Sequence, residues 1–403
     1  METTTAFVGL DCLDCDQRFD AGETTHRCPE CGGILDPAYD YDALDIDAET
    51  FATRRFDTLW RYEEVLPFAR ETAVTMNEGG TPLVECPTLA DSIGVGEVYI
   101  KDEGRNPTGT FKDRGQTGAV TAAVQHGADE IALDTAGNAG QSAAAYAAAG
   151  GLEAHVWLPD RSGFIQRAMT EVHGGDVRVV DGDFSDAGAA YADAIENHPE
   201  WHSVKSFETP YRHETKKTML YETIEQLNWE APDAVIYPTG GGVGLVGMQK
   251  AARELVKLGM TESLPGMYVA QSAGCAPVVE AWNENKAIHE AWDGISTAFG
   301  GIAVPDPSAS PLILDALEES GGEAAAATDD AIADAAIEVA QTEGIEMGAT
   351  CAAAAATAFT FVDRGDLDSD DTVVLINTGT GNKDASLLRS QIAEQEANAT
   401  TTD

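Results

Sequence analysis

Residues 98–127 read VYIKDEGRNPTGTFKDRGQTGAVTAAVQHG. The run VYIKDE alternates apolar and polar side chains as a strand does, a turn marked by glycine and proline follows, and QTGAVTAAVQHG has the composition of a helix. Lys112, one of nine lysines among 403 residues, stands on that turn. A strand, a turn and a helix in this order predict one repeating unit of an α/β protein.

The same rhythm continues along the chain on both sides of this stretch. Short β-rich runs alternate with alanine-rich stretches of helical length; they are VYIKDE, IALDTA, AHVWLP, VRVVDG, AVIYPTG, MYVAQS and TVVLINTG. This alternation predicts parallel sheets that are covered by helices on both faces, with ligands bound at the carboxyl ends of the strands.

The charge balance excludes some classes of partner. The chain has 69 Asp and Glu against 24 Lys and Arg, a formal net charge of −45, so it cannot assemble the basic face that binding of nucleic acid requires. Hydrophobic residues make up 43% of the chain and the acidic residues are spread along it, which favours a folded protein with a carboxylate-covered surface over a disordered chain. We therefore expect a protein of a salt-loaded cytoplasm, in which the Debye length is about 3 Å or less.

Two further features favour a cytoplasmic location without a membrane partner. No uninterrupted apolar stretch reaches the roughly 18 residues of a membrane span, and the start METTTAFVGL has no basic region ahead of an apolar core. Cys86, Cys275 and Cys351 are scattered along the chain, unlike the cysteines of a secreted disulfide framework.

The other four cysteines form two pairs near the N-terminus. Cys12 and Cys15 lie in CLDC, and Cys28 and Cys31 lie in CPEC, with twelve residues between the pairs. Two such knuckles can bring four thiolates to one tetrahedral point, where structural Zn²⁺ supplies folding energy that a short segment lacks. The alternatives are two redox pairs or metal-free thiols, although a redox role would need a βαβ context that is absent here.

Two loops at predicted strand ends suit a cofactor with a phosphate and an aldehyde. The loop after DAVIY consists of Gly240, Gly241, Gly242, Val243 and Gly244. Its backbone amides and the helix that follows could bind a phosphate. Lys112 could attack the aldehyde if apolar surroundings keep its amine neutral. Taken singly, the glycines could form a plain tight turn and Lys112 could be a surface residue, but together they indicate pyridoxal phosphate.

Two more strand ends carry polar residues that suit the same cofactor. Asn138, in AGNAG, could donate its amide to the phenolic oxygen of pyridoxal phosphate while neighbouring backbone amides bind a substrate carboxylate; the alternative is a simple helix cap. Thr378, in INTGTG, could face the pyridine nitrogen, where a neutral partner weakens the electron withdrawal by the ring.

Five segments together resemble the fold-type II (tryptophan synthase β-like) family of pyridoxal-phosphate enzymes, and within it the threonine synthases. They are EGRNPTGTFKDRG, GNAGQSAAAYAA, PYRHETKKT, PTGGGVGLVGM and NTGTGNKD, in this order over roughly residues 80–390. The resemblance implies two α/β subdomains with parallel sheets flanked by helices, and archaeal-type relatives also carry a small N-terminal cysteine-rich module.

The resemblance implies a role for each matching residue. Lys112 matches the lysine that forms a Schiff base with the cofactor, Asn138 the asparagine near the cofactor's O3′, and Thr378 the residue at the ring nitrogen. Residues 240–244 match the phosphate cradle. Two residues fall where the family contacts its substrate; they are Thr135 and Arg212.

An arginine fork suits a phosphate or a carboxylate, and the alternative for Arg212 is a solvent-facing helix residue. Two departures from the family pattern bear on the substrate more than on the cofactor. Thr380 stands where the final motif usually has a histidine, and MGATCAA lacks the glutamate of a related segment.

These observations predict four parts of the chain. Residues 1–38 form a zinc-ribbon-like module and residues 39–80 a helical linker. Residues 81–393 form the pyridoxal-phosphate-dependent catalytic region, and residues 394–403, within AEQEANATTTD, form a flexible acidic tail without apolar periodicity.

The activity that the resemblance implies is conversion of O-phospho-L-homoserine, an amino-acid phosphate, and water to L-threonine and phosphate by γ-elimination and β-replacement. One alternative is a threonine or serine ammonia-lyase or a related β-eliminating enzyme, which needs the same lysine and cradle but no site for a γ-phosphate. The other is a non-catalytic regulatory protein with the zinc module as its interaction surface. A homodimer is compatible with either enzyme.

Overall fold

The computed structural model describes residues 1–24, 26–54 and 58–401. The chain divides into two compact units. The first unit comprises Met1–Gly80, Asn106–Glu225 and Val246–Glu262. The second comprises Thr81–Arg105, Gln226–Leu245 and Ser263–Asp403. The predicted ribbon and linker thus both fall in the first unit, and the predicted catalytic region is shared between the two.

The N-terminal module of the first unit is a small antiparallel sheet with strand order β2-β1-β3. The strands are β1 (Phe7–Cys12), β2 (Arg18–Phe19) and β3 (Leu35–Tyr39). Leu10 and Leu35 are buried beneath the sheet. The predicted helical linker contains only short turns of helix, and its residues 55–57 lie outside the described part of the chain. These turns are η1 (Tyr41–Ala43), α1 (Ala48–Ala52), η2 (Leu59–Val65) and η3 (Arg70–Thr72).

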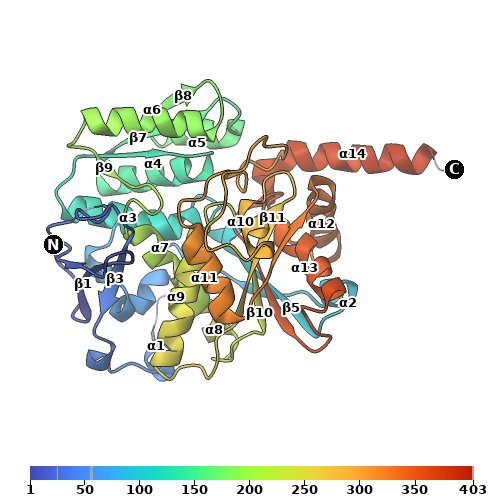
Figure 1. The fold of residues 1–403 in the computed structure, drawn as a ribbon, viewed down its shortest axis with the longest axis horizontal. Coiled ribbons are helices and arrows are strands. Elements are labelled where there is room, and N and C mark those ends of the chain that lie inside the picture. The colour runs from blue at the N-terminus through green and yellow to red at the C-terminus, as the bar shows by residue number, and fades with distance from the viewer. Residues whose placement is uncertain (25, 55–57, 402–403) are drawn as a thin grey trace. The chain divides into compact units, whose positions relative to one another are not determined.

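The first unit also holds a four-stranded parallel sheet with strand order β8-β7-β6-β9. Its strands are β6 (Glu130–Asp134), β7 (Glu153–Pro159), β8 (Asp176–Val180) and β9 (His202–Ser203). Ile131 and Leu133 pack with α3 (Lys112–Gln125) and α4 (Asn138–Gly150), whereas Ala132 packs with α6 (Phe184–Asn197). The strand period of two therefore sends alternate side chains to helices on opposite faces, and α4 and α6 flank β7 in Figure 1.

The remaining helices that lie in this unit, wholly or for most of their length, are α5 (Phe164–Val172), α7 (Tyr211–Lys216), α8 (Thr218–Gln226) and α9 (Val243–Lys257). The sequence marks several helix ends. For example, the Asp183 carboxylate accepts hydrogen bonds from the Ser185 and Asp186 amides at the start of α6, and Gly151 ends α4 in a left-handed conformation.

The second unit is built on a six-stranded sheet with strand order β12-β11-β10-β13-β5-β4, in which only β4 runs antiparallel to its neighbour. The strands are β4 (Leu83–Glu85), β5 (Glu97–Asp102), β10 (Ala234–Pro238), β11 (Gly266–Ser272), β12 (Ala324–Ala327) and β13 (Thr372–Asn377). The helical segments are α2 (Pro87–Ile93), η4 (Glu103–Arg105), α10 (Pro277–Asn283), α11 (Ser310–Ser320), α12 (Asp329–Thr342), α13 (Ala353–Arg364), η5 (Gly381–Asp384) and α14 (Ala385–Thr401). All seven predicted β-rich runs contain a strand of one of the two parallel sheets.

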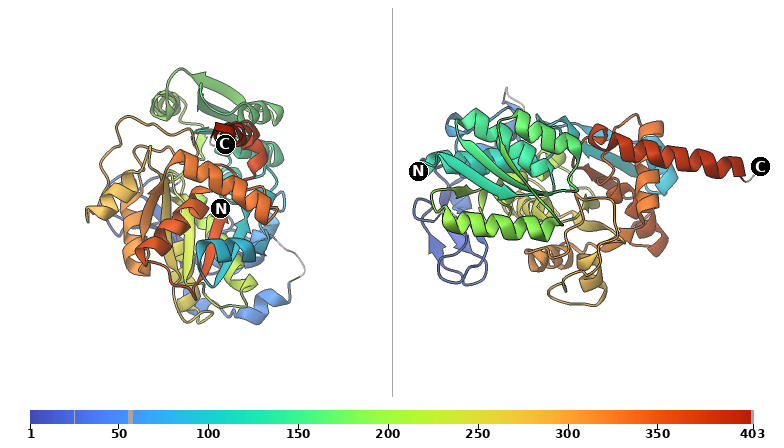
Figure 2. Two further views of the ribbon diagram at one scale, coloured as in Figure 1. Left: turned by 90° about the vertical axis from the view of Figure 1, so that its right-hand side faces the viewer. Right: turned by 90° about the horizontal axis from the view of Figure 1, so that it is seen from above.

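The predicted tail at 394–403 is not separated from the helix that precedes it. It continues α14, which Figure 2 shows as one long helix leading to the C-terminus, and only its residues 402–403 lie outside the described chain. Among the residues that the structure describes, no helix has both the length and the apolar character that crossing a membrane requires.

Candidate active site

Lys112 is the first residue of α3 and directly follows the NPTGTF loop. Its side chain is half-buried, and its Nζ lies 4.3 Å from the centre of the Phe111 ring. The neighbouring Asp113 carboxylate accepts hydrogen bonds from Thr108 N and Oγ1, at 2.7 and 2.6 Å, and from Ser142 Oγ on α4, at 2.6 Å. Burial raises the pKa of Asp113 to about 6. These bonds tie the loop to two helices and hold Lys112 at a defined place.

The connection between β6 and α4 carries Thr135 and Asn138. Thr135 is buried, and its Oγ1 accepts a hydrogen bond from Gly137 N at 3.0 Å. Gly137 has a φ of +148° and is the N-cap residue of α4, while no side chain makes a capping hydrogen bond there. The half-buried Asn138 is the first residue within the helix, so a simple helix cap does not describe it.

Arg212 lies on α7 and is only 1% exposed, so the solvent-facing alternative is wrong. Its Nη1 donates a hydrogen bond to Val204 O at 2.6 Å. A Cβ built on Gly115 of α3 would lie 2.8 Å from Arg212 Nε and 2.0 Å from Lys216 Nζ. Lys216 is also fully buried, and sequence reasoning missed it. The signal that could have revealed it is a second cation four residues after the arginine on the same helix.

The second unit provides the glycine loop between β10 and α9. Gly242 has a φ of +71°, and a Cβ on it would lie 2.2 Å from Ile313 Cδ1. A Cβ on Gly244 would lie 2.6 Å from Tyr237 Oη, whereas one on Gly241 would meet nothing within 4 Å. The loop therefore turns sharply into the N-terminus of α9 and leaves space beside Gly241, as a phosphate cradle needs.

Alanine at two positions of this loop is expected to separate folding from cofactor binding. Gly242→Ala should destabilise the second unit by about 2–4 kcal/mol, because it adds left-handed strain and overpacking against Ile313. Gly241→Ala should leave thermal stability of the cofactor-free protein unchanged but weaken pyridoxal phosphate binding about tenfold or more, since its methyl group would enter the cradle. Thermal unfolding and cofactor titration check both results; equal effects of the two variants on stability would contradict this description.

Thr378 follows β13 in the second unit. Its side chain is half-buried, and its Oγ1 lies 3.1 Å from Cys351 Sγ. Burial raises the pKa of Cys351 to about 11, which keeps this thiol protonated near neutral pH. The preceding Asn377 is buried and donates from Nδ2 to Asp102 Oδ1 at 2.8 Å. Sequence reasoning did not single out Cys351 as a contact of Thr378.

The two departures from the family pattern lie side by side. Met347 of MGATCAA pairs with Thr380 in an antiparallel β-bridge, and Gly348 N donates to Gly379 O at 3.0 Å. The two segments that depart from the family pattern therefore lie in one local region, close to Thr378.

Comparison with known families identifies the family of the chain. Residues 74–379 match the family described as pyridoxal-phosphate dependent enzyme. The chain belongs to this family.

Curated relatives of this pyridoxal-phosphate-dependent enzyme include threonine synthases. The threonine synthase of Methanosarcina acetivorans is 36% identical over 92% of this chain and 91% of the relative. That of Methanocaldococcus jannaschii is 35% identical over 93% of this chain and 92% of the relative. The similarity thus extends over nearly the whole of each protein.

Solved structures share the fold at lower sequence identity. An L-serine ammonia-lyase from Rhizomucor miehei has a TM-score of 0.68 and 20% identity, covering 78% of this chain and 97% of that one. A processed threonine deaminase isoform from Solanum lycopersicum has a TM-score of 0.63 and 21% identity, covering 74% and 79%. At this identity the comparison bears on the fold alone, and it confirms the predicted fold-type II architecture.

The four N-terminal cysteines come together as predicted. Their four sulfur atoms all lie within 4.8 Å of one another, and the sulfur–sulfur distance is 3.5 Å for Cys12–Cys31 and 3.7 Å for Cys15–Cys28. Because sulfurs of the two motifs interleave, the arrangement suits one tetrahedral metal ion better than two separate redox pairs. Cys31 is exposed and Cys15 half-buried, whereas three cysteines outside the module are buried; they are Cys86, Cys275 and Cys351.

Proposed function

We propose that the chain converts O-phospho-L-homoserine and water to L-threonine and phosphate. Beside the threonine synthase relatives, one observation supports this proposal most directly. The buried Arg212 approaches Gly115, which lies one helical turn after Lys112 on α3. A guanidinium this close to the helix that carries the reactive amine can bind the phosphate of a substrate that the amine deprotonates.

Pyridoxal phosphate, when bound, supplies a conjugated ring that stabilises negative charge at the substrate's α carbon. We assign its phosphate to the amides of residues 240–244, its phenolic oxygen to the Asn138 amide and its ring nitrogen to the Thr378 hydroxyl. Lys112 would hold the cofactor through its aldehyde when no substrate is bound. Thr135 contacts the substrate next to these groups.

With the substrate bound, the role of the Lys112 amine would be to move protons. It removes the α proton and then a β proton, and the phosphate leaves from the γ carbon while Arg212 stabilises its charge. Protonation of the γ carbon, addition of the hydroxyl group of water at the β carbon and return of a proton to the α carbon then give L-threonine. Every atom of the phosphate leaves as inorganic phosphate, and water supplies the new hydroxyl group.

Two parallel assays test this function against its alternative. Purified protein with pyridoxal phosphate is given O-phospho-L-homoserine in one assay and L-threonine or L-serine in the other. We expect phosphate release with formation of L-threonine in the first and little ammonia in the second. Ammonia release without phosphate release would instead assign the chain to the ammonia-lyases, and a protein without either activity would favour the regulatory alternative.

We also propose that the cysteine cluster holds structural Zn²⁺. Four thiolates fill a tetrahedral site and leave no open position for catalysis. A chelator under reducing conditions is expected to remove about one zinc ion per chain and to unfold residues 1–38 at temperatures at which the α/β sheets stay folded, because the small module depends on metal binding for its stability. Metal analysis and circular dichroism check this result; a metal-free protein with an unchanged melting curve would refute it.

The acidic surface supports a role as a halophilic enzyme in a salt-loaded cytoplasm, without nucleic acid as a partner. With a net charge of −45, the carboxylates of the folded chain repel one another strongly when salt is dilute. Dialysis from about 3 M KCl into dilute buffer should therefore unfold the protein and abolish its activity. Salt-free sucrose of the same osmolarity should restore neither the folded state nor the activity. A protein that stays folded and active in dilute buffer would rule out this proposal. Sedimentation in concentrated salt would decide whether the enzyme is a homodimer.

A further inference from the structure

The helix α7 faces two structural elements of the first unit. Arg212 and Lys216 approach Gly115 of α3, as described above. His213 and Glu214 instead contact β3 of the N-terminal module that holds the four clustered cysteines, called the cysteine module from here on. With only six residues, Tyr211–Lys216, α7 is too short to be stable by itself, so its position depends on the elements that pack against it.

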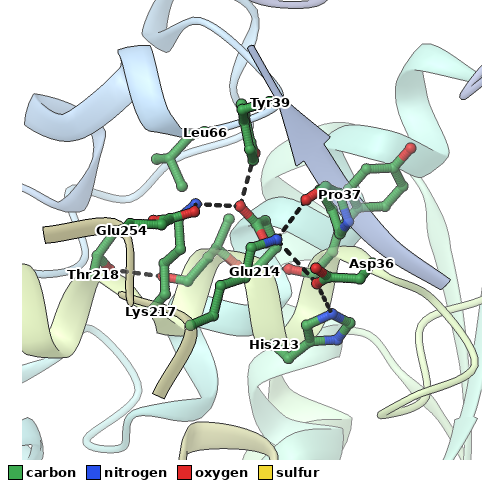
Figure 3. Close-up of polar contacts among 12 residues, drawn as sticks. Asp36, Pro37, Tyr39, Leu66, His213, Glu214, Lys217, Thr218 and Glu254 are labelled. Carbon is green, nitrogen blue, oxygen red and sulfur yellow. Dashed lines mark hydrogen bonds and ion pairs between the residues drawn. The ribbon is translucent and has the colours of Figure 1, made fainter. Parts of the chain in front are cut away.

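The contacts with β3 join specific side chains, which are buried on α7 and half-buried at Asp36. Asp36 Oδ1 accepts a hydrogen bond from His213 Nε2 at 2.9 Å, and Tyr39 Oη donates to Glu214 Oε1 at 2.7 Å. Figure 3 shows these side chains pointing toward one another from β3 and α7. Glu214 is 0% exposed and His213 1% exposed, so water competes little for these bonds.

Two lysines extend these contacts into a network. Lys250 Nζ lies 2.9 Å from Asp36 Oδ1 and 2.6 Å from Glu214 Oε2, and thereby joins β3, α7 and α9. Lys217 Nζ, just after α7, lies 2.5 Å from Glu214 Oε1 and 2.8 Å from Glu254 Oε1. Burial alone would raise the pKa of Asp36, but Lys250 and His213 hold it well below its ordinary value. Asp36 is therefore ionised and fixed to two groups near α7.

We infer that the cysteine module positions α7, and that Asp36 and Tyr39 are positioning residues for Arg212 and its bound phosphate. The inference rests on the proposed role of Arg212. We assign no substrate contact to either β3 residue. Asp36 instead holds His213, and Tyr39 holds Glu214. These are the two residues that directly follow Arg212 on α7. A small displacement of a short helix changes the direction of every side chain on it, and phosphate binding by a guanidinium fork depends on that direction.

Asp36→Asn tests this inference in the full-length, cofactor-loaded protein. The neutral amide keeps the shape of the side chain but removes the charge that attracts Lys250 and orders His213. We expect KM for O-phospho-L-homoserine and the dissociation constant of inorganic phosphate, measured by calorimetry, each to rise about tenfold, whereas kcat and the visible absorption of bound cofactor change less than about twofold. Tyr39→Phe should produce the same pattern with a smaller amplitude, since it removes one hydrogen bond.

Arg18→Gln is the matched control. Arg18 also lies in the cysteine module, but it pairs with Asp11 at the surface and its side chain is 54% exposed. It should leave phosphate affinity, KM and kcat unchanged. Unchanged phosphate affinity in folded Asp36→Asn, or equal loss in Arg18→Gln, would overturn the inference. If Asp36→Asn does not fold, Tyr39→Phe decides the question by the same measurements. If the unmodified protein releases no phosphate from O-phospho-L-homoserine, the proposed function is wrong. The phosphate affinities of Asp36→Asn and the unmodified protein would still test the inference.

Discussion

Lys112→Ala is expected to lower the rate of phosphate release from O-phospho-L-homoserine by on the order of 10³-fold or more, because one amine both holds the cofactor and moves the substrate's protons. The half-buried amine lies beside the Phe111 ring at the start of α3, where Asp113 ties the preceding loop in place. Alanine at 112 should leave these loop contacts intact, since they use other side chains. The loss should therefore appear in activity and not in folding.

Three measurements check this result together: the initial rate, the visible absorption of the cofactor, and borohydride labelling followed by peptide mapping. Wild type should carry the label on Lys112, and Lys112→Ala should carry none there. Lys257→Ala, a change of an exposed lysine at the end of α9, is the control and should retain activity and label. Labelling of another lysine in the wild type, or full activity of Lys112→Ala, would disprove the assigned role.

Glu222→Ala is expected to destabilise the protein by about 3–5 kcal/mol, because it leaves a buried guanidinium without its carboxylate. Arg114 Nη1 and Nη2 each donate to one oxygen of Glu222 at 2.7 Å, and the two residues are 0% and 3% exposed. Glu222 Oε1 also accepts from Gly80 N at 3.0 Å. The fork connects α3 to α8 two residues after Lys112, so its loss should also reduce cofactor binding.

Urea unfolding in concentrated KCl, followed by tryptophan fluorescence, measures this change. The control is Arg18→Gln, which breaks an ion pair at the surface and should alter stability by about 1 kcal/mol or less. If Glu222→Ala also lowered the free energy of unfolding by only about 1 kcal/mol or less, the buried ion pair would contribute little to stability.

Much of the fold could be predicted because the relevant signals are local. Each predicted β-rich run is followed by a helix. Strands and helices place apolar residues at different periods along the chain, so the two can be told apart from the sequence. The assignment to the pyridoxal-phosphate-dependent enzymes, and the resemblance to threonine synthases within them, was confirmed by the comparisons. The four cysteines could also be grouped in advance, since their spacing alone restricts them to one small module.

Strand β12 shows where local signals fail. Its sequence, residues 324–327, is four alanines, a composition typical of helices. It forms a strand because it pairs in parallel with β11, from Val269↔Ala324 to Ser272↔Ala327, and is almost wholly buried there. Tertiary pairing overrides intrinsic propensity in this case.

Contacts between distant segments were the other part that sequence reasoning could not supply. The Arg114–Glu222 fork joins residues 108 positions apart, and the contact of Cys351 with Thr378 joins residues 27 apart. The docking of β3 on α7 through Asp36 likewise depends on the folded chain and has no local pattern. By contrast, the burial of Lys216 one turn after Arg212 could have been suspected from their spacing, because a cation at that position shares a helix face with the arginine.

The cysteines of this protein differ in solvent exposure, so their reaction with a thiol reagent can report on the metal content of the N-terminal module. Since Cys86, Cys275 and Cys351 are buried within the α/β units, a chromogenic thiol reagent applied to the native protein should react first in the N-terminal module, beginning at the exposed Cys31. Bound metal would slow that reaction, because coordinated thiolates are poor nucleophiles compared with uncoordinated ones. The colour developed in the first minutes would thus measure how much of the module in each preparation lacks metal, before the buried cysteines of the α/β units react.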